Sequence, residues 1–328
     1  MQEDPIARKR SRGGMLDVGD DSEGAIQTLM NIGARTFAIK DKSIYELIMA
    51  DDLDPERTNI HVPNIIHKLV LNEGIESQVV SQVFLTASMF FKKGQLLEPQ
   101  LLKVWELIVE LTKEAINLKK QIDDYYEKEL SANEKYDLDR ANKSAPALPK
   151  VVDLGTSMKT IIQKAEHMYQ IMIELASVIL PRLKLKPLAH FSSFSTSVTE
   201  MFGERHGFSI FLTDNLDFMK EIKEVRNGLD HRVPKVSLKD YTFNPDTTVC
   251  LPSISLNSKD AKFDAMPVTE YLNKLESIFS FAEVLICHLA NVTIPHMSGE
   301  IKEIPVETRR YKYVRYCFYI PGLDFFQQ

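Results

Sequence analysis

The feature that most constrains the fold is the recurrence of apolar residues every three or four positions from Glu76 onward. That spacing places side chains on one face of an α-helix, whereas a half-buried strand needs alternation. Two rows with the helical spacing occur in the first half of the chain. They are Val79, Val83, Ala87 and Phe90, then Leu101, Val104, Trp105, Ile108, Leu111, Ala115, Leu118, Ile122 and Tyr125. The rows predict two helices joined near residues 92–99, the second one long and charged on its outer face.

The second half of the chain keeps the same period in three long predicted helices, and a shorter helix is predicted near 192–207, between the first two. The first spans about 155–180, the second begins at Asp214 as its N-cap and ends near His231, and the last spans 268–291. The predicted buried positions of the first helix are Met158, Ile161, Ile162, Ala165, Met168, Met172, Leu175 and Ile179. Those of the second are Phe218, Ile222, Val225 and Leu229. Those of the last are Leu272, Leu275, Phe279, Ala282, Leu285, Ile286 and Leu289. We therefore expect a mainly α protein.

Two segments of the second half depart from the helical period. Residues 235–262 alternate between apolar and polar positions, which predicts a small antiparallel β insert. Residues 308–320 are rich in aromatic and β-branched residues, which favours a C-terminal strand.

The composition along the chain suggests four parts. Residues 1–25 are expected to be a disordered tail with basic and acidic residues, and 26–140 a helical module of unknown role. Residues 141–153 lose the periodicity and contain two prolines, so they are predicted to be a linker. The remaining part, 154–328, is expected to be a helical domain that carries the β insert and the C-terminal strand.

Within the N-terminal module, residues 26–60 are predicted to form short helices broken by "DDLDPERTN". The four carboxylates of that stretch resemble a metal loop, but the calcium pattern DxDxDG is absent. A turn before a helix that starts at Pro55 explains them more simply. No metal ion and no cofactor are expected.

Charge and apolar content limit where this protein acts. A formal net charge of −6 argues against a surface coated for nucleic-acid binding, although a few local phosphate contacts remain compatible with it. The most apolar run, near 277–292, is interrupted by Glu283 and His288, so we expect no membrane span. The N-terminus lacks the apolar core of a secretory signal, and the three widely spaced cysteines fit a reducing compartment. A cytoplasmic protein is expected.

The stretch "EVRNGLDHRVP", residues 224–234, concentrates the chemistry. Arg226 and His231 are five positions apart, so roughly 140° separates them around a helix axis. One straight helix therefore cannot clamp a phosphate between them, whereas a bent helix end or two copies meeting across a dimer axis can. Gly228 permits a close approach of another segment. The simpler interpretation is a surface ion pair between Arg226 and Asp230, followed by a histidine at a helix C-terminus.

Arg226, Asn227, Gly228, Leu229, Asp230 and His231 together resemble the R-x4-H signature of HEPN domains. HEPN domains are four- or five-helix bundles that often dimerise, and their catalytic members are metal-independent endoribonucleases of toxin and antiviral-defence systems. The resemblance covers about 155–292 and implies that Arg226 and His231 are catalytic and that Asn227 supports them. Histidine moves protons near neutral pH, and arginine carries fixed positive charge for phosphate oxygens, as RNA self-cleavage requires.

The leading functional hypothesis is therefore a HEPN-like endoribonuclease that cuts single-stranded RNA by attack of the 2′-hydroxyl. It is expected to act as a homodimer, with an antitoxin or another partner protein as a further candidate, in abortive infection or antiviral defence. The alternative is a non-catalytic HEPN-like module that binds protein or RNA, and the third hypothesis is a helical scaffold. Because the two site side chains lie off the apolar row, Ala at 226 or 231 is expected to leave thermal stability nearly unchanged.

Other polar residues are weaker candidates for function. The stretch "RRYKYVRY" interleaves cations with rings that suit stacking on bases, or else it is an edge strand guarded by charge. Its candidate RNA contacts are Arg309, Arg310, Tyr311, Lys312, Tyr313 and Arg315. His167 follows Glu166 and is either a second histidine of the same cleft or a boundary or surface histidine, of which we expect the latter. No zinc-binding pair of histidines and no phosphate-binding glycine loop is present.

Overall fold

The computed structural model divides the chain into two compact units, residues 1–109 with 290–328, and residues 110–289. The structure describes residues 5–11, 16–33, 35–92, 94, 96–142, 147–186, 189–231, 235–244, 248–293, 300–309 and 311–319. The first division falls inside the long helix α5 (Glu98–Asn142). The predicted linker, residues 141–153, therefore lies within the second unit, where α5 ends at Asn142.

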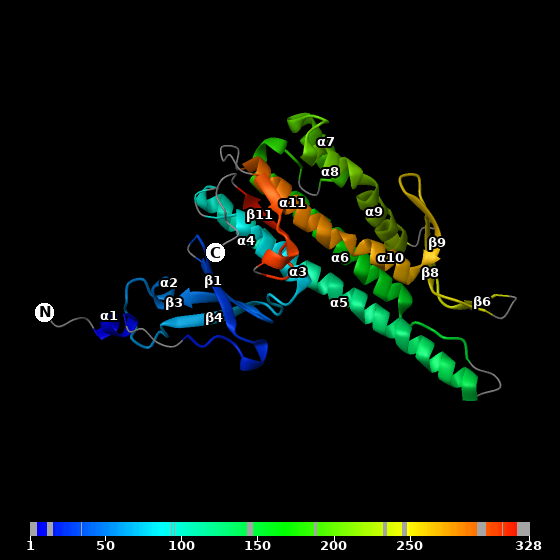
Figure 1. Cartoon of the computed structure of the whole chain (residues 1–328), viewed down its shortest axis with the longest axis horizontal. Coiled ribbons are helices and arrows are strands. Elements are labelled where there is room, and N and C mark those ends of the chain that lie inside the picture. The colour runs from blue at the N-terminus through cyan, green and yellow to red at the C-terminus, as the bar shows by residue number, and fades with distance from the viewer. Residues whose placement is uncertain are drawn as a thin grey trace. The chain divides into compact units, whose positions relative to one another are not determined.

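The expectation of a mainly α protein is wrong. Helices account for 57% of the described residues and strands for 18%, and the strands form several small antiparallel sheets. The fold is therefore mixed α and β. The largest departure is in residues 26–71, where a four-stranded sheet replaces the short helices that we expected (Figure 1).

The sheet of the first unit is an antiparallel meander in the order β1-β2-β3-β4. Its strands are β1 (Ile26–Ile32), β2 (Arg35–Lys40), β3 (Ile44–Met49) and β4 (Ile65–Leu71). β-Branched and aromatic residues suit the pleated backbone, and Gly33 takes the left-handed conformation (φ 56°) in the turn after β1. Half-buried and exposed positions alternate along β1 up to the buried Ile32, whereas the last four residues of β2 are all buried.

The expected disordered tail contains a short helix, α1 (Pro5–Arg10), that is bound to the first unit. The Arg10 side chain is 7% exposed and pairs with Asp51 and with Asp54, whose nearest oxygen is 2.6 Å away. Hydrogen bonds from the Thr58 and Asn59 backbone, and then from Arg10, lower the pKa of the Asp54 carboxyl. The acidic stretch that follows β3 therefore binds the N-terminal segment of the chain. It contains a short helix, α2 (Ala50–Leu53).

Beyond the sheet, the first predicted helical row is confirmed as three consecutive segments. They are α3 (Gln78–Val80), the π-helical turn Ser81–Leu85, and α4 (Thr86–Phe90). All of its predicted apolar positions are buried, as are those of the row along α5. The rings of Phe37 and Trp105 each contact Phe84 edge to face, at centroid distances of 5.9 and 5.3 Å. Sheet and helices of the first unit thus share one core.

The C-terminal strand is shorter than expected. It is β11 (Tyr316–Tyr319), and it pairs with β10 (Glu300–Glu303) in a two-stranded antiparallel ribbon. Residues 306–308 form a helical turn instead of a strand.

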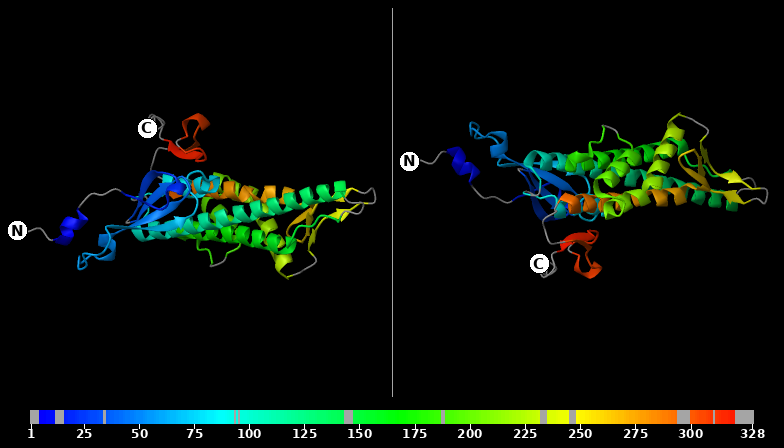
Figure 2. Two further views of the ribbon diagram at one scale, coloured as in Figure 1. Left: turned by 90° about the horizontal axis from the view of Figure 1, so that it is seen from below. Right: turned by 90° about the horizontal axis from the view of Figure 1, so that it is seen from above.

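Besides the β insert, the described residues of the second unit form the rest of α5 and six further α-helices, which run roughly along one direction (Figures 1 and 2). They are α6 (Leu154–Ile179), α7 (Phe191–Phe202), α8 (Gly207–Asp214), α9 (Leu216–His231), α10 (Val268–Leu275) and α11 (Ser277–Thr293). All predicted buried positions of α6 and of the last helical segment are buried. Asp214 is the last residue of α8, so the predicted N-cap is wrong. Phe218 and Leu229 are only half-buried, and Met219 and Gly228 replace them on the buried face of α9.

Strands lie between α9 and α10, as the alternating pattern of residues 235–262 predicted, but the last strand, β9, lies almost entirely beyond that range. β5 (Val236–Lys239), β8 (Ser253–Asn257) and β9 (Lys262–Pro267) form an antiparallel sheet in the order β5-β8-β9. Two short strands, β6 (Thr242–Phe243) and β7 (Val249–Cys250), pair with each other. Figure 1 shows the sheet at the end of the unit where α9 stops.

One helical stretch of the described residues, Val268–Thr293, is long and apolar enough to cross a bilayer, which sequence analysis did not expect. Of its most apolar window, 61% is buried inside the protein, and Glu283 within it has no exposed surface. A buried core helix meets the same criteria of length and composition.

His288 of α11 makes the stability of the second unit depend on pH. Its ring stacks on Phe208 (5.2 Å between centroids), and burial, then His206, lowers its pKa from 6.5 to about 4. Between these values the unfolded chain binds a proton that the folded chain excludes. The His288 contribution to the free energy of unfolding is therefore complete above pH 6.5. It falls by up to about 1.4 kcal/mol per pH unit on acidification towards pH 4.

Urea unfolding of the natural protein and of His288→Phe across this pH range measures the contribution. We expect a smaller loss of stability on acidification for His288→Phe. Equal pH dependence of the two proteins would contradict the assignment to His288.

Candidate functional site

The R-x4-H segment forms the last part of α9, which packs against α6 through buried Ile222 and Val225. Gly228 lies on the same side, close to β5. A methyl group at position 228 would be 2.3 Å from Cγ2 of Val236, so no larger residue fits without a shift. Because Gly228 has no side chain, β5 lies close to the backbone of α9 at this position. This contact fixes the end of α9 against the β insert.

Arg226 is held by two carboxylates, one from each helix. Its Nε is 2.9 Å from Glu166 Oε2 of α6 and 2.9 Å from Asp230 Oδ2 one turn further along α9. Nε has no partner that meets hydrogen-bond geometry, so both contacts are ion pairs by distance alone. Nη1 donates a weak hydrogen bond to Asn227 Oδ1 at 3.3 Å. About a third of the Arg226 side chain, 34%, is exposed.

Asp230 completes a cluster with further residues of α6. Lys159 Nζ is 2.9 Å from its Oδ1, and Gln163 Nε2 donates to the same oxygen at 3.1 Å. The bond from Lys159 is the largest cause that lowers the pKa of the Asp230 carboxyl. We call Lys159, Gln163, Glu166, Arg226 and Asp230 the α6–α9 polar cluster. Two cations and two carboxylates cancel within it, so the cluster has no net formal charge.

His231 is the last residue of α9 and is exposed to solvent. Among the described residues, none forms a hydrogen bond or ion pair with the His231 side chain. Residues 232–234 are outside the described part of the chain. A solvent-facing imidazole at a helix end is accessible to an incoming substrate. It is also the least constrained member of the motif.

His167 does not share the α6–α9 polar cluster. Its Nδ1 is 3.6 Å from Glu114 Oε2 of α5, and Lys164 Nζ is 2.9 Å from the same oxygen. Because Glu166 faces α9 while His167 faces α5, the two neighbours lie on different sides of α6. His167 is therefore a surface histidine, with 54% of its side chain exposed.

The C-terminal cations, which belong to the first unit, are partly engaged within their own segment. The Arg309 side chain is 12% exposed and donates to the Ile304 carbonyl and to Glu303. Lys312 lies 4.8 Å from the centroid of the Tyr313 ring, and Arg315 5.5 Å from that of Tyr316. Arg310 is outside the described residues, and Tyr311 is half-buried. Among the described members of these predicted RNA contacts, Lys312 is exposed and the others are half-buried.

No group of three or more metal-binding side chains occurs in the part of the chain that the structure describes. Two of the acidic residues that follow β3, Asp51 and Asp54, are engaged with Arg10. The three cysteines are free thiols.

Comparison with protein-family models, curated proteins and solved structures found no match. The resemblance to HEPN domains is therefore carried by the motif and its helical context alone. The catalytic roles of Arg226, Asn227 and His231 remain predictions.

Sequence reasoning missed the α6 half of the cluster, although a signal was present. Lys159, Gln163 and Glu166 are spaced by four and three residues, so they form a polar row on the predicted helix. A polar row beside a buried apolar row marks the boundary of a helix–helix contact. The partner helix, however, lies about sixty positions away and cannot be identified from this spacing.

The geometry revises the expected effect of substitution at Arg226. Arg226→Ala should lower the free energy of unfolding by about 1–3 kcal/mol, because it leaves Glu166 and Asp230 facing each other without their shared cation. Those two side chains are only 19% and 13% exposed. Arg226→Lys keeps the charge and should retain most of the stability. Chemical denaturation of both variants tests this, and an unchanged midpoint for Arg226→Ala would show that the ion pairs contribute nothing.

Proposed function

We propose that this protein is a metal-independent endoribonuclease of the HEPN type, acting on single-stranded RNA in the cytoplasm. The observation that carries the proposal is the arrangement at the end of α9. Arg226 is oriented by side chains of two helices, and His231, one turn further on, is open to solvent. Toxin or antiviral-defence activity, with an antitoxin as partner, follows only from the family resemblance.

In the proposed reaction, the 2′-oxygen attacks the adjacent phosphorus and the 5′-oxygen leaves. The products are a 2′,3′-cyclic phosphate and a 5′-hydroxyl. His231 accepts the 2′-hydroxyl proton, and a second His231 protonates the leaving oxygen. Arg226 stabilises the charge of the phosphorane through its outer nitrogens, since both carboxylates make their closest contact at Nε.

A homodimer is part of this proposal for two reasons. The angular offset between positions 226 and 231 separates them on one helix, and general acid and base need two imidazoles. In addition, the α6–α9 polar cluster is electrically neutral, so a single copy supplies little net positive charge for a phosphate. A twofold axis at the ends of two α9 helices brings two histidines and two arginines together.

The neutral cluster also favours the alternative function. An arginine that is already paired with two carboxylates serves well as a structural tie between α6 and α9. In that case the protein is a non-catalytic HEPN-like module that binds protein or RNA.

Cleavage of a single-stranded RNA in EDTA separates the two candidates. We expect His231→Ala to lower the rate by at least about 100-fold, since general acid–base catalysis contributes on that order or more. His190→Ala is the matched control, because this exposed histidine precedes α7 and its side chain makes no capping bond. It should cut like the natural protein. No cleavage by the natural protein, or full cleavage by His231→Ala, would exclude the endoribonuclease.

Mixing with an inactive variant tests whether two copies build the site. A dimer of one natural chain and one His231→Ala chain holds only one of the two imidazoles, so it should be inactive. When equal amounts of the two proteins are unfolded and refolded together, the activity of the natural protein should therefore fall to about half. Unchanged activity after this treatment would place a complete site within one chain.

A further inference from the structure

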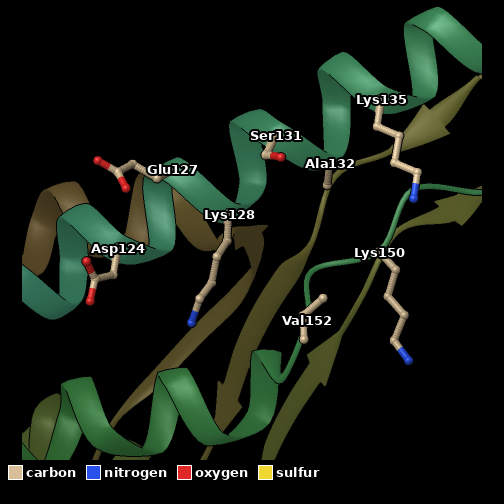
Figure 3. Close-up of a pocket in the computed structure, with 8 residues that line it drawn as sticks. All are labelled: Asp124, Glu127, Lys128, Ser131, Ala132, Lys135, Lys150 and Val152. Carbon is tan, nitrogen blue, oxygen red and sulfur yellow. The ribbon is translucent and has the colours of Figure 1, made fainter.

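A groove lies beside the last part of α5 in the second unit, with a volume of about 550 Å³ (Figure 3). One wall is α5 and the other is the stretch that leads into α6. The lining residues are Asp124, Glu127, Lys128, Ser131, Ala132, Lys135, Lys150 and Val152. Nothing in the R-x4-H segment belongs to this groove.

The helical repeat of α5 directs polar side chains into the groove. Asp124, Lys128, Ser131 and Lys135 are spaced by four, three and four residues, so they share one face of the helix. Figure 3 shows Lys128 and Lys135 extending from the same side of α5, Lys135 towards the stretch that carries Lys150 and Lys128 towards the start of α6. The buried apolar row of α5 points elsewhere. This polar face therefore has no role in the core.

Among the residues that the structure describes, no carboxylate oxygen lies within 4.0 Å of the ammonium groups of Lys128, Lys135 or Lys150. Lys119 on the same helix differs, since Asp123 and Glu276 lie 2.5 and 3.1 Å from its Nζ. Lys128 donates only to a neutral group, Ser157 Oγ, at 3.2 Å.

The distribution of charge favours a ligand with more than one anionic group. Asp124 and Glu127 line one end and Lys135 the other, so anions are favoured towards the lysine end. Lys128 and Lys135 are separated by roughly 10 Å along the helix axis, so each can bind a different phosphate. Val152, which is 64% exposed, adds an apolar contact suitable for a ribose or a base.

We propose that this groove binds a ligand carrying two or more phosphate groups, through Lys128, Lys135 and Lys150. Two sources share this chemistry, a single-stranded nucleic-acid backbone and a free nucleotide polyphosphate. The site is separate from Arg226 and His231, and its occupancy does not require RNA cleavage.

Binding to the full-length protein tests the proposal with two probes. The first is a fluorescent 2′-O-methyl oligoribonucleotide, which cannot be cleaved, followed by anisotropy at low ionic strength. The second is ATP or inorganic pyrophosphate, added as a competitor. Lys128→Gln/Lys135→Gln should weaken oligonucleotide binding about 10-fold or more. It should also reduce the slope of log affinity against log salt by about 1.4, corresponding to two lost phosphate contacts.

Lys113→Gln/Lys120→Gln is the matched control, because both lysines are exposed on α5 and line no part of the groove. It should bind like the natural protein, and Glu127→Gln, which removes an opposing charge, should bind more tightly. Displacement of the oligonucleotide by ATP or pyrophosphate identifies a free polyphosphate as a sufficient ligand, and binding without displacement identifies the strand. The proposal is overturned if the natural protein binds neither probe, or if the two double variants weaken binding equally.

Discussion

The contact between α6 and α9 is the interaction on which the candidate site depends. The apolar row of α6 is buried along its whole length, and α9 adds Ile222 and Val225 to the same interior. Only because these faces are fixed do Glu166 and Arg226, sixty positions apart in sequence, come within 2.9 Å. Burial of apolar surface supplies most of the driving force, and the ion pairs at its edge select how the two helices are aligned.

Electrostatic balance decides what the end of α9 can do alone. An arginine that shares two carboxylates is well oriented but attracts an anion only weakly, since the carboxylates offset its charge. His231 differs, because it is exposed to solvent. A reaction at this position therefore needs further positive charge, which a second copy of the chain would supply. In one chain the motif holds a helix contact together.

The helices were predictable from sequence because a period of 3.6 residues reports burial directly. Every expected apolar position of α5 and α6 is buried. The N-terminal sheet was missed because β2 ends in four consecutive buried residues, which breaks the alternation by which a strand is identified. Of the candidate site, the residues on α9 could be predicted from sequence and those on α6 could not. Its α9 residues form a compact motif, whereas Glu166 becomes relevant only through a tertiary contact that no local spacing encodes.

The contact between Gly228 and Val236 links two positions that must change together. Since a methyl group at 228 collides with the valine, a larger residue there requires a smaller one at 236, and neither exchange is neutral alone. Homologous chains should therefore show correlated residue sizes at these two positions. Such covariation would record the junction of helix and insert independently of any catalytic motif. It would also remain in chains that have lost the arginine or the histidine.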